Sequence, residues 1–194
     1  MDLTIIISVL VLYLIVLLGI GTWGARDTKN LAGYYLANKR LPGWVVGFSS
    51  NATGESGWLL LGLTGMGYAV GAHALWVVLG EVLGVTCGWV LVAIPFKHFT
   101  DRYGSITVPD YLESRLRDKS QGLRLVSAVI VCSMVIAYTA AQMTASGKAF
   151  DAFLGTGYTG GVLIGAAVIF YYTTIGGFKA VAYSDFVQGL LMFF

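Results

Sequence analysis

The sequence predicts an all-α membrane protein. Of its 194 residues, 57% are hydrophobic and only 11% are charged, whereas a soluble domain carries roughly 25% charged residues. The mean hydropathy is +0.77, and long apolar stretches recur along the chain. A hydrocarbon core roughly 30 Å thick needs about 20 apolar residues of helix. Several of these stretches are long enough to cross a membrane as helices.

The apolar stretches predict five complete transmembrane helices and the start of a sixth. The predicted spans cover residues 3–23, 44–71, 75–96, 123–147, 161–176 and 184–194. The last of these is much shorter than a bilayer is thick. We therefore expect residues 1–194 to be a single transmembrane domain and the N-terminal fragment of a longer polypeptide.

Lysine and arginine fall almost entirely on one side of these spans. If the spans are counted correctly, eleven of the twelve cations lie on that side and Lys148 lies opposite. Cytoplasmic loops are enriched in Lys and Arg, so we expect a multi-pass protein of the plasma membrane with its N-terminus outside. The loop 97–122 is then cytoplasmic. Its segment from Thr107 to Arg117, TVPDYLESRLR, has the apolar spacing of a short interfacial helix.

Several classes of function are excluded by composition. The formal net charge is +2 and no block of like charges occurs, so neither a nucleic-acid binder nor a disordered chain is expected. The two cysteines, Cys87 and Cys132, lie inside apolar stretches and are too few for a disulfide framework or a thiolate metal site. We expect both to be buried free thiols.

The middle of the second predicted span breaks the rules for a membrane helix. From Ser49 to Gly57 it reads SSNATGESG, in which eight of nine residues are Gly, Ala, Ser, Thr or Asn and the ninth is Glu55. Unwound backbone at this depth survives only inside protein or beside a wet cavity. We expect the helix to unwind here, so that freed carbonyls bind a cation and the following half-helix faces a solute.

A packing face is the alternative for this segment. Small residues let helices approach closely, and their hydroxyls can bond back to their own helix. Packing alone would place small residues about every fourth position rather than in one run. It also leaves Glu55 unexplained, because a carboxylate at a helix centre costs about 2.5 to 3.5 kcal/mol. We therefore favour an ion or solute site.

Other polar residues at membrane depth are further candidates. Glu81 lies in the third span and either lines a solute path or reaches a water-filled vestibule, while Asp185 opens the sixth span as an ion ligand, a helix cap or both. Tyr138 lies four residues before Gln142, which places both on one face of the fourth span. The pair at residues 176–177 predicts a hinge or a helix stop.

Three motifs carry a resemblance to a known family. The sequences SGWLLLGLTG, TVPDYLESR and IGGFKAVAYSDFVQ occur in this order, and they resemble the sodium/solute symporter family, most of all its sodium/proline symporter branch. The resemblance implies a LeuT-like fold, in which an extra helix precedes two inverted repeats of five helices. This chain would supply the extra helix, four helices of the first repeat and the start of the fifth. The second repeat would be missing.

The resemblance also implies roles for individual residues. Backbone carbonyls of Ala52 and Glu55 would bind sodium, and Asp185 matches an aspartate associated with a second sodium in some members. Ser56 and Trp58 match residues implicated in ion and solute handling, and Tyr138 matches a tyrosine associated with the solute.

This chain also departs from the family pattern. The proline branch has aspartate where this chain has Gly54, methionine where it has Glu55, and an apolar residue where it has Glu81. An alternative register with the sugar-transporting branch moves the carbonyl ligands toward Ser49 and Ala52.

The function implied is sodium-coupled import of a small organic solute, proline or a related amino acid, by alternating access. Sodium would be a co-transported substrate, no cofactor is expected, and the partners would be the solute, sodium and the lipid bilayer. The alternatives are a symporter of a sugar, carboxylate or vitamin, and the solute-sensing membrane domain of a receptor. An intramembrane enzyme is disfavoured, because neither a nucleophile-base pair nor a histidine-containing metal spacing accompanies Glu55 or Asp185.

Overall fold

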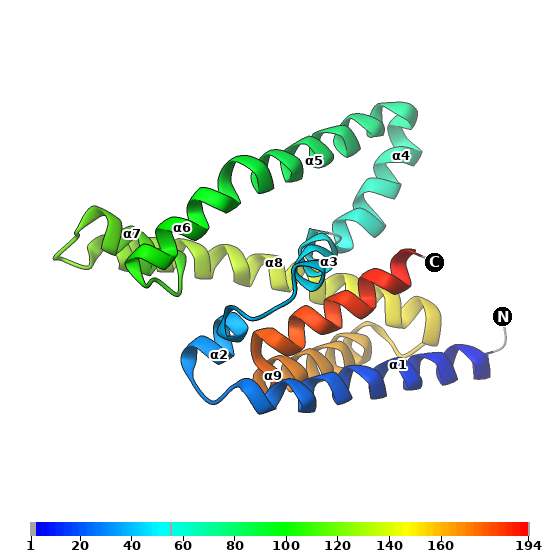
Figure 1. Ribbon diagram of the computed structural model, residues 1–194. Helices are drawn as coiled ribbons and strands as arrows, with labels where there is room; N and C mark the ends of the chain where they lie inside the picture. The colour runs from blue at the N-terminus through cyan, green and yellow to red at the C-terminus, as the bar shows by residue number, and fades with distance from the viewer. Residues whose placement is uncertain (1–2, 55, 194) are drawn as a thin grey trace. The chain divides into compact units, whose positions relative to one another are not determined.

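The computed structural model describes residues 3–54 and 56–193, which form helices and turns without any strand (Figure 1). Within these described ranges, four helical stretches are long and apolar enough to cross a membrane. They are Thr4–Gly24, Leu61–Tyr103, Gly122–Leu154 and Tyr158–Met192. The chain is therefore an all-α, multi-pass membrane protein, as its composition predicts. The number of spans and the inverted-repeat arrangement stay predictions.

The chain divides into two compact units. The first comprises Met1–Gly57 with Ala140–Phe194, and the second comprises Trp58–Thr139. In the first unit, both α1 (Leu3–Gly24) and α3 (Gly43–Gly54) pack against α9 (Tyr158–Phe193). Small residues form much of the contact between α1 and α9; they are Gly21, Gly24, Gly176 and Ala180. Such residues let membrane helices approach each other closely.

A short segment joins α1 to α3 and also contacts α9. It consists of one 3-10 turn (Ala25–Asp27), α2 (Leu31–Leu36) and a second 3-10 turn (Ala37–Lys39). The Asn30 side chain caps α2 by accepting a hydrogen bond of 2.6 Å from the Gly33 amide. The loop that precedes the second predicted span therefore has its own helical structure.

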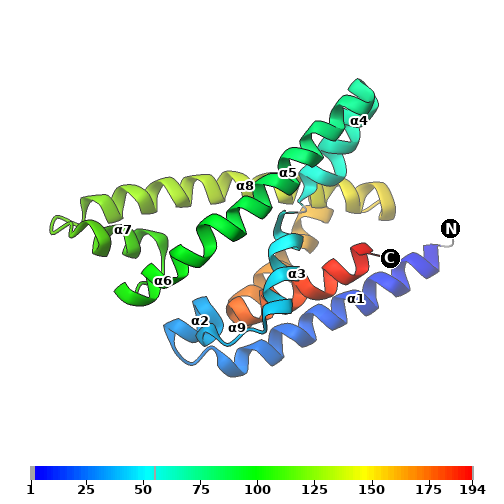
Figure 2. The ribbon, with the colours of Figure 1, turned by 45° about the horizontal axis from the view of Figure 1, so that its top comes forward.

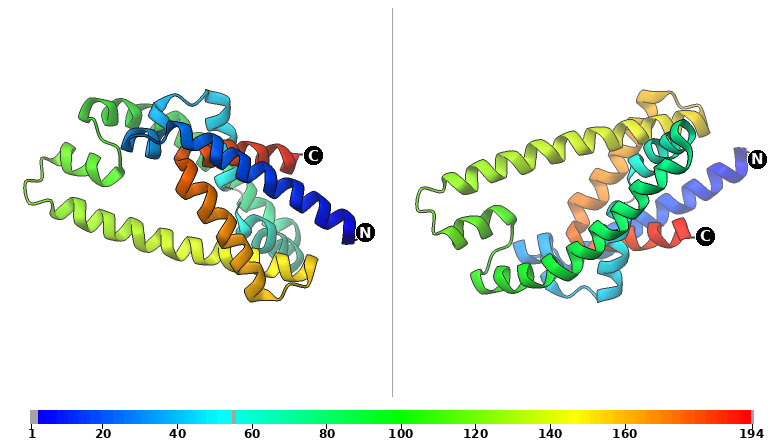
Figure 3. Two further views of the ribbon diagram at one scale, coloured as in Figure 1. Left: turned by 90° about the horizontal axis from the view of Figure 1, so that it is seen from below. Right: turned by 90° about the horizontal axis from the view of Figure 1, so that it is seen from above.

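The helix α9 bends sharply at Gly177, which has φ 57° and ψ −159°. Figure 3 shows its orange and red halves running in different directions from this bend. Only glycine adopts this conformation readily, and a Cβ here would lie 2.8 Å from the Tyr34 carbonyl oxygen. The loop expected between the fifth and sixth spans is instead helical from Phe178 onward, since the bend needs a single residue.

The second unit is a series of helical segments joined by bends. A π-helical segment (Trp58–Leu63) leads into α4 (Thr64–Val70), and a 3-10 turn (Gly71–Ala74) then leads into α5 (Leu75–Cys87). A second π-helical segment (Gly88–Ala93) continues into α6 (Ile94–Tyr103), so this helix extends beyond its predicted end at residue 96. Many large apolar side chains of these segments are exposed, including Trp76, Leu83 and Leu91. The free cysteines Cys87 and Cys132 are exposed as well, so the expectation that they are buried was wrong. Figure 2 shows α4 and α5 meeting at a turn.

The helix α7 (Val108–Leu116) coincides with the short helix predicted between Thr107 and Arg117. Thr107 and Asp110 form a reciprocal capping box, because each side chain accepts from the other residue's backbone amide at 3.2 Å. The turn that follows ends at α8 (Gly122–Leu154), a helix that contributes to both units. Whether α7 lies at the membrane interface stays a prediction.

Candidate ion and solute site

The structure interrupts the second predicted span beside Ser56. The helix α3 ends at Gly54, Ser56 lies outside any helix, and the π-helical segment begins at Trp58. The Ser56 amide donates to the Gly54 carbonyl oxygen at 3.0 Å, and the Gly57 amide donates to Gln142 Oε1 at 3.0 Å. In a continuous α-helix these amides would donate to the carbonyls of Ala52 and Thr53. The Ser56 and Gly57 amides therefore donate to other acceptors than those of a continuous α-helix.

The interruption is shorter than the sequence suggests. We expected unwinding between Ser49 and Gly57, but the backbone is helical through Gly54. The Thr53 hydroxyl donates to the Ser49 carbonyl oxygen at 2.8 Å, which is the bonding expected of a helix that satisfies its own hydroxyls. Glu55, which we expected to bind sodium, lies outside the described residues.

Asp185 lies opposite α3, on the C-terminal half of α9. Its Oδ2 accepts a hydrogen bond of 2.8 Å from the Ser49 hydroxyl, and it also has a side-chain hydrogen bond with Thr53. Ser49 is buried, and the neighbouring Ser184 is fully buried with its hydroxyl bonded to the Val181 carbonyl. The structure thus brings the Asp185 carboxylate of α9 together with the Ser49 and Thr53 hydroxyls of α3. Such oxygen ligands suit hard cations.

Aromatic side chains neighbour Ser49 on α3 and Asp185 on α9. Phe48 precedes Ser49, Phe186 follows Asp185, and the two rings meet edge to face at a centroid distance of 5.3 Å. Trp44 also packs edge to face against Phe186, at a centroid distance of 4.7 Å. Edge-to-face contacts stabilise aromatic pairs beyond their buried area. They fix α3 against α9 where the hydroxyl meets the carboxylate.

A second polar contact lies one turn further along α9 and was not predicted. Gln188 Nε2 donates to the Tyr13 hydroxyl oxygen at 2.6 Å, which joins α9 to α1. Gln188 is the only polar side chain in the apolar run Phe186–Phe194. That isolation is the signal that could have identified it, because polar side chains in membrane helices bond across to other helices.

Ala52 and Ser56 also belong to the first unit. Ala52 faces α9, since a Cβ built on Gly189 would lie 3.9 Å from the Ala52 Cβ. Ser56 lies in the interruption itself. The structure therefore brings Ala52 and Asp185 to the contact between α3 and α9.

Three other predicted site residues belong to the second unit. Trp58 begins the first π-helical segment and its ring covers Gly62. Glu81 lies on α5 and Tyr138 on α8, and all three side chains are exposed. Their contribution to a solute site stays a prediction.

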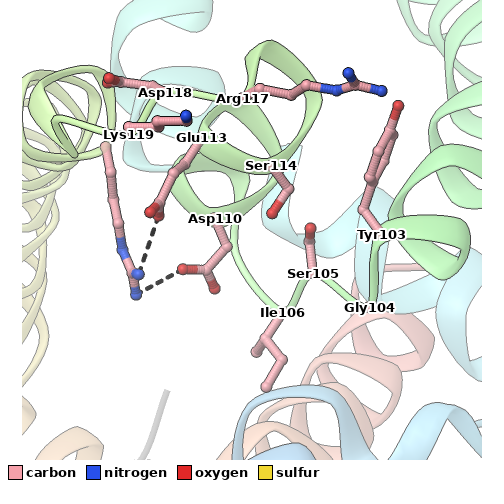
Figure 4. Close-up of a pocket in the computed structure, with 11 residues that line it drawn as sticks. Tyr103, Gly104, Ser105, Ile106, Asp110, Glu113, Ser114, Arg117, Asp118 and Lys119 are labelled. Atoms are coloured by element: carbon pink, nitrogen blue, oxygen red, sulfur yellow. Dashed lines mark hydrogen bonds and ion pairs between the residues drawn. The ribbon is translucent and has the colours of Figure 1, made fainter.

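A cavity of about 540 Å³ lies within the second unit, around α7 and the start of α8 (Figure 4). Arg124 crosses it to pair with Asp110 at 2.7 Å and Glu113 at 3.1 Å. Asp118 accepts hydrogen bonds from the hydroxyl and amide of Ser120 and from the Leu123 amide. These hydrogen bonds hold the pKa of Asp118 below its ordinary value. The polar lining thus joins α7 to the first turn of α8.

The fold and the site together define a class of protein: a multi-pass helical membrane protein with a polar interruption in one of its apolar segments. The chain belongs to the sodium:solute symporter family, whose family model matches residues 34–194. No solved structure matches the chain.

Curated relatives are similar over most of this chain. The high-affinity proline transporter PutP of Bacillus subtilis (strain 168) is 38% identical over 90% of the chain and 37% of its own length. The osmoregulated proline transporter OpuE of the same strain is 36% identical over 100% of the chain and 39% of its own length. A sodium/proline symporter of Staphylococcus aureus (strain JH9) is 33% identical over 93% of the chain and 36% of its own length. The chain therefore spans less than two fifths of the length of these relatives.

Proposed function

We propose that this protein is a sodium-coupled symporter that imports proline or a related amino acid across the plasma membrane. The observation that carries the proposal is the helix interruption at Ser56, which follows the Ser49 and Thr53 hydroxyls that bind Asp185 by about two turns and one turn of helix. Released backbone carbonyls at an interrupted helix are what secondary transporters use to hold a coupling ion. The relatives named as proline transporters support the choice of solute. The protein is a transporter and no enzyme.

The proposed sodium ligands come from both sides of the contact between α3 and α9. The backbone carbonyls of Ala52 and Glu55 would hold one ion, and Asp185 would supply carboxylate oxygen to an ion beside Ser49 and Thr53. Ser56, Trp58, Tyr138 and Glu81 are the proposed solute-binding residues. Ligands from the remaining helices of a LeuT-like fold would complete both sites.

The proposed mechanism is alternating access. Sodium binding stabilises the arrangement of half-helices that binds solute, and linkage requires the solute to raise sodium affinity by the same factor, typically worth about 1 to 3 kcal/mol. The membrane potential adds about 2.3 kcal/mol per 100 mV for each charge that enters. The inward sodium gradient and the membrane potential would both drive import, and no covalent chemistry is needed. The N-terminus would lie outside and the loop 97–122 in the cytoplasm.

Uptake of labelled proline by cells that express the gene encoding this chain tests the proposal. We expect uptake in sodium buffer and loss of uptake when choline replaces sodium. The control is the same host without the gene. Uptake that persists without sodium and follows an imposed proton gradient would contradict sodium coupling.

A further inference from the structure

We propose that the cavity around α7 binds a zwitterionic phosphate ester, in which a phosphate group is joined to a primary ammonium, as in the headgroup of phosphatidylethanolamine. The cavity measures about 540 Å³ and is lined by residues between Tyr103 and Arg124. None of these lining residues belongs to the proposed ion and solute site. The inference therefore goes beyond the proposed function and does not depend on it.

An unpartnered hydroxyl borders this cavity. Ser105 lines it and is only 7% exposed, and the Ser105 Oγ has no hydrogen-bond partner among the described residues. A buried polar group without a partner destabilises a fold, and a ligand oxygen that accepts from it would remove that cost. Figure 4 shows the Ser105 and Ser114 hydroxyls pointing into the same part of the cavity.

This part of the cavity is positive and rich in hydrogen-bond donors. The Arg117 side chain extends toward the Tyr103 hydroxyl, whereas the Asp118 side chain extends in the opposite direction (Figure 4). Arg117 thus shares its end of the cavity with three hydroxyls, those of Tyr103, Ser105 and Ser114. Guanidinium and hydroxyl donors are the groups that bind phosphate oxygens in proteins.

The other end of the cavity carries an excess of negative charge. Arg124 pairs with Asp110 at 2.7 Å and with Glu113 at 3.1 Å, so two carboxylates share one guanidinium. Asp118 and Lys119 complete the charged lining. Three carboxylates therefore face two cations at this end. A primary ammonium would balance the excess and donate hydrogen bonds to carboxylate oxygens.

The lining as a whole is neutral, but its charges are separated, which favours a zwitterion over a simple anion. The phosphate would lie beside Arg117 and Ser105, and the ammonium beside Asp110 and Glu113. Exposed apolar side chains at Ile106, Val108 and Leu116 neighbour these polar groups along the chain, and they suit contact with acyl chains. A lipid headgroup and a soluble phosphate ester share the chemistry, and the experiment distinguishes them.

Native mass spectrometry of the purified protein, with one ligand titrated at a time, tests the choice of ligand. Phosphatidylglycerol keeps the phosphate without an ammonium, and the quaternary ammonium of phosphatidylcholine cannot donate hydrogen bonds. We expect phosphatidylethanolamine to bind about tenfold more tightly than either lipid, consistent with the loss of a charge-assisted hydrogen bond. Glycerophosphoethanolamine has the same headgroup without acyl chains. Weaker binding of this soluble ester assigns the site to a lipid, and equal binding assigns it to a soluble ligand.

Two substitutions test the positive end of the cavity. Arg117→Gln removes the charge, and we expect it to weaken phosphatidylethanolamine binding about tenfold, whereas Ser105→Ala, which removes one neutral donor, should weaken it about threefold. In lipid-free protein, Ser105→Ala should leave the thermal midpoint unchanged or raise it, because it removes an unpartnered buried hydroxyl. That measurement shows that the variant folds.

Arg102→Gln is the matched control, since it makes the same charge change on α6 at a residue outside the cavity lining. We expect its lipid affinity to equal that of the unsubstituted protein. The inference is overturned if phosphatidylglycerol or phosphatidylcholine binds as tightly as phosphatidylethanolamine, or if neither phosphatidylethanolamine nor the soluble ester binds. It is also overturned if Arg117→Gln and Arg102→Gln weaken binding equally.

Discussion

At the scale of single residues, the contact between Ser49 and Asp185 is the most informative feature of the site. A serine hydroxyl of one helix donates to a carboxylate of another at 2.8 Å, about two turns before the backbone interruption at Ser56. Ionisable side chains in membrane helices are costly and mark functional sites. Asp185 is therefore the side chain whose charge should matter most for a cation.

Replacing Asp185 with asparagine should raise the sodium concentration needed for half-maximal proline uptake. The substitution keeps the shape and an acceptor for Ser49 but removes the negative charge, and we expect about a tenfold effect, equivalent to roughly 1.4 kcal/mol. The measurement is uptake against sodium concentration, with membrane insertion checked by immunoblot. Asp101→Asn is the control, since Asp101 forms an exposed pair with Lys97.

Glu55→Gln belongs to the same series. If sodium dependence is unchanged in both Asp185→Asn and Glu55→Gln, the assignment of Asp185 to sodium is wrong and the Glu55 carboxylate has no part in sodium binding; the backbone carbonyl of Glu55 is not changed by this substitution.

Single residues also show what the sequence can and cannot predict. The run of small residues located the interruption, and Asp185 was identified by its charge in an apolar setting. The length of the interruption was not predictable, because Ser49 and Thr53 remain helical through bonds to Asp185 and to the backbone. The acceptor Gln142 comes from a helix 85 residues away. No local pattern specifies such a partner.

At the scale of elements, the bend in α9 follows from one residue. Gly177 has a conformation that side-chain-bearing residues rarely adopt, and the Tyr34 carbonyl oxygen lies where a Cβ would be. The sequence located this hinge correctly from its glycine pair. The sequence did not predict that the helix continues beyond Gly177, because a run that includes Lys179 and Ser184 has the polarity of a loop.

Gly177→Ala should destabilise the protein. A residue forced into this region of φ and ψ costs about 1 to 3 kcal/mol, and the close carbonyl adds a steric penalty. We expect a lower thermal midpoint in detergent, measured by fluorescence-detected size exclusion after heating.

Gly160→Ala is the control within the same helix, because a Cβ there meets Thr156 only at an ordinary 3.6 Å. Alanine is also preferred to glycine inside a helix. An equal loss of thermal stability in both variants would show that the conformation of Gly177 is not the cause.

At the scale of the whole molecule, composition alone predicted the class. Large apolar side chains remain exposed along α1, α5 and α8, which suits helices that face lipid or further helices. The positions of loops and charges predict the orientation in the membrane.

Single cysteines should reveal that orientation. In a background with Cys87 and Cys132 replaced by alanine, we expect Thr156→Cys to react with a membrane-impermeant maleimide in intact cells. Lys119→Cys should react only after the membrane is permeabilised, because the loop 97–122 is expected in the cytoplasm. The reverse labelling pattern would place the N-terminus inside.

The rings of Phe48, Phe186 and Trp44 have a consequence for ion choice. They pack against one another next to Ser49 and Asp185 in the chain, at centroid distances of 5.3 and 4.7 Å. If Ser49 and Asp185 bind the ion as proposed, a change in their separation to fit lithium or potassium would also require these rings to shift. Discrimination among alkali metals would then belong to apolar side chains that never touch the ion.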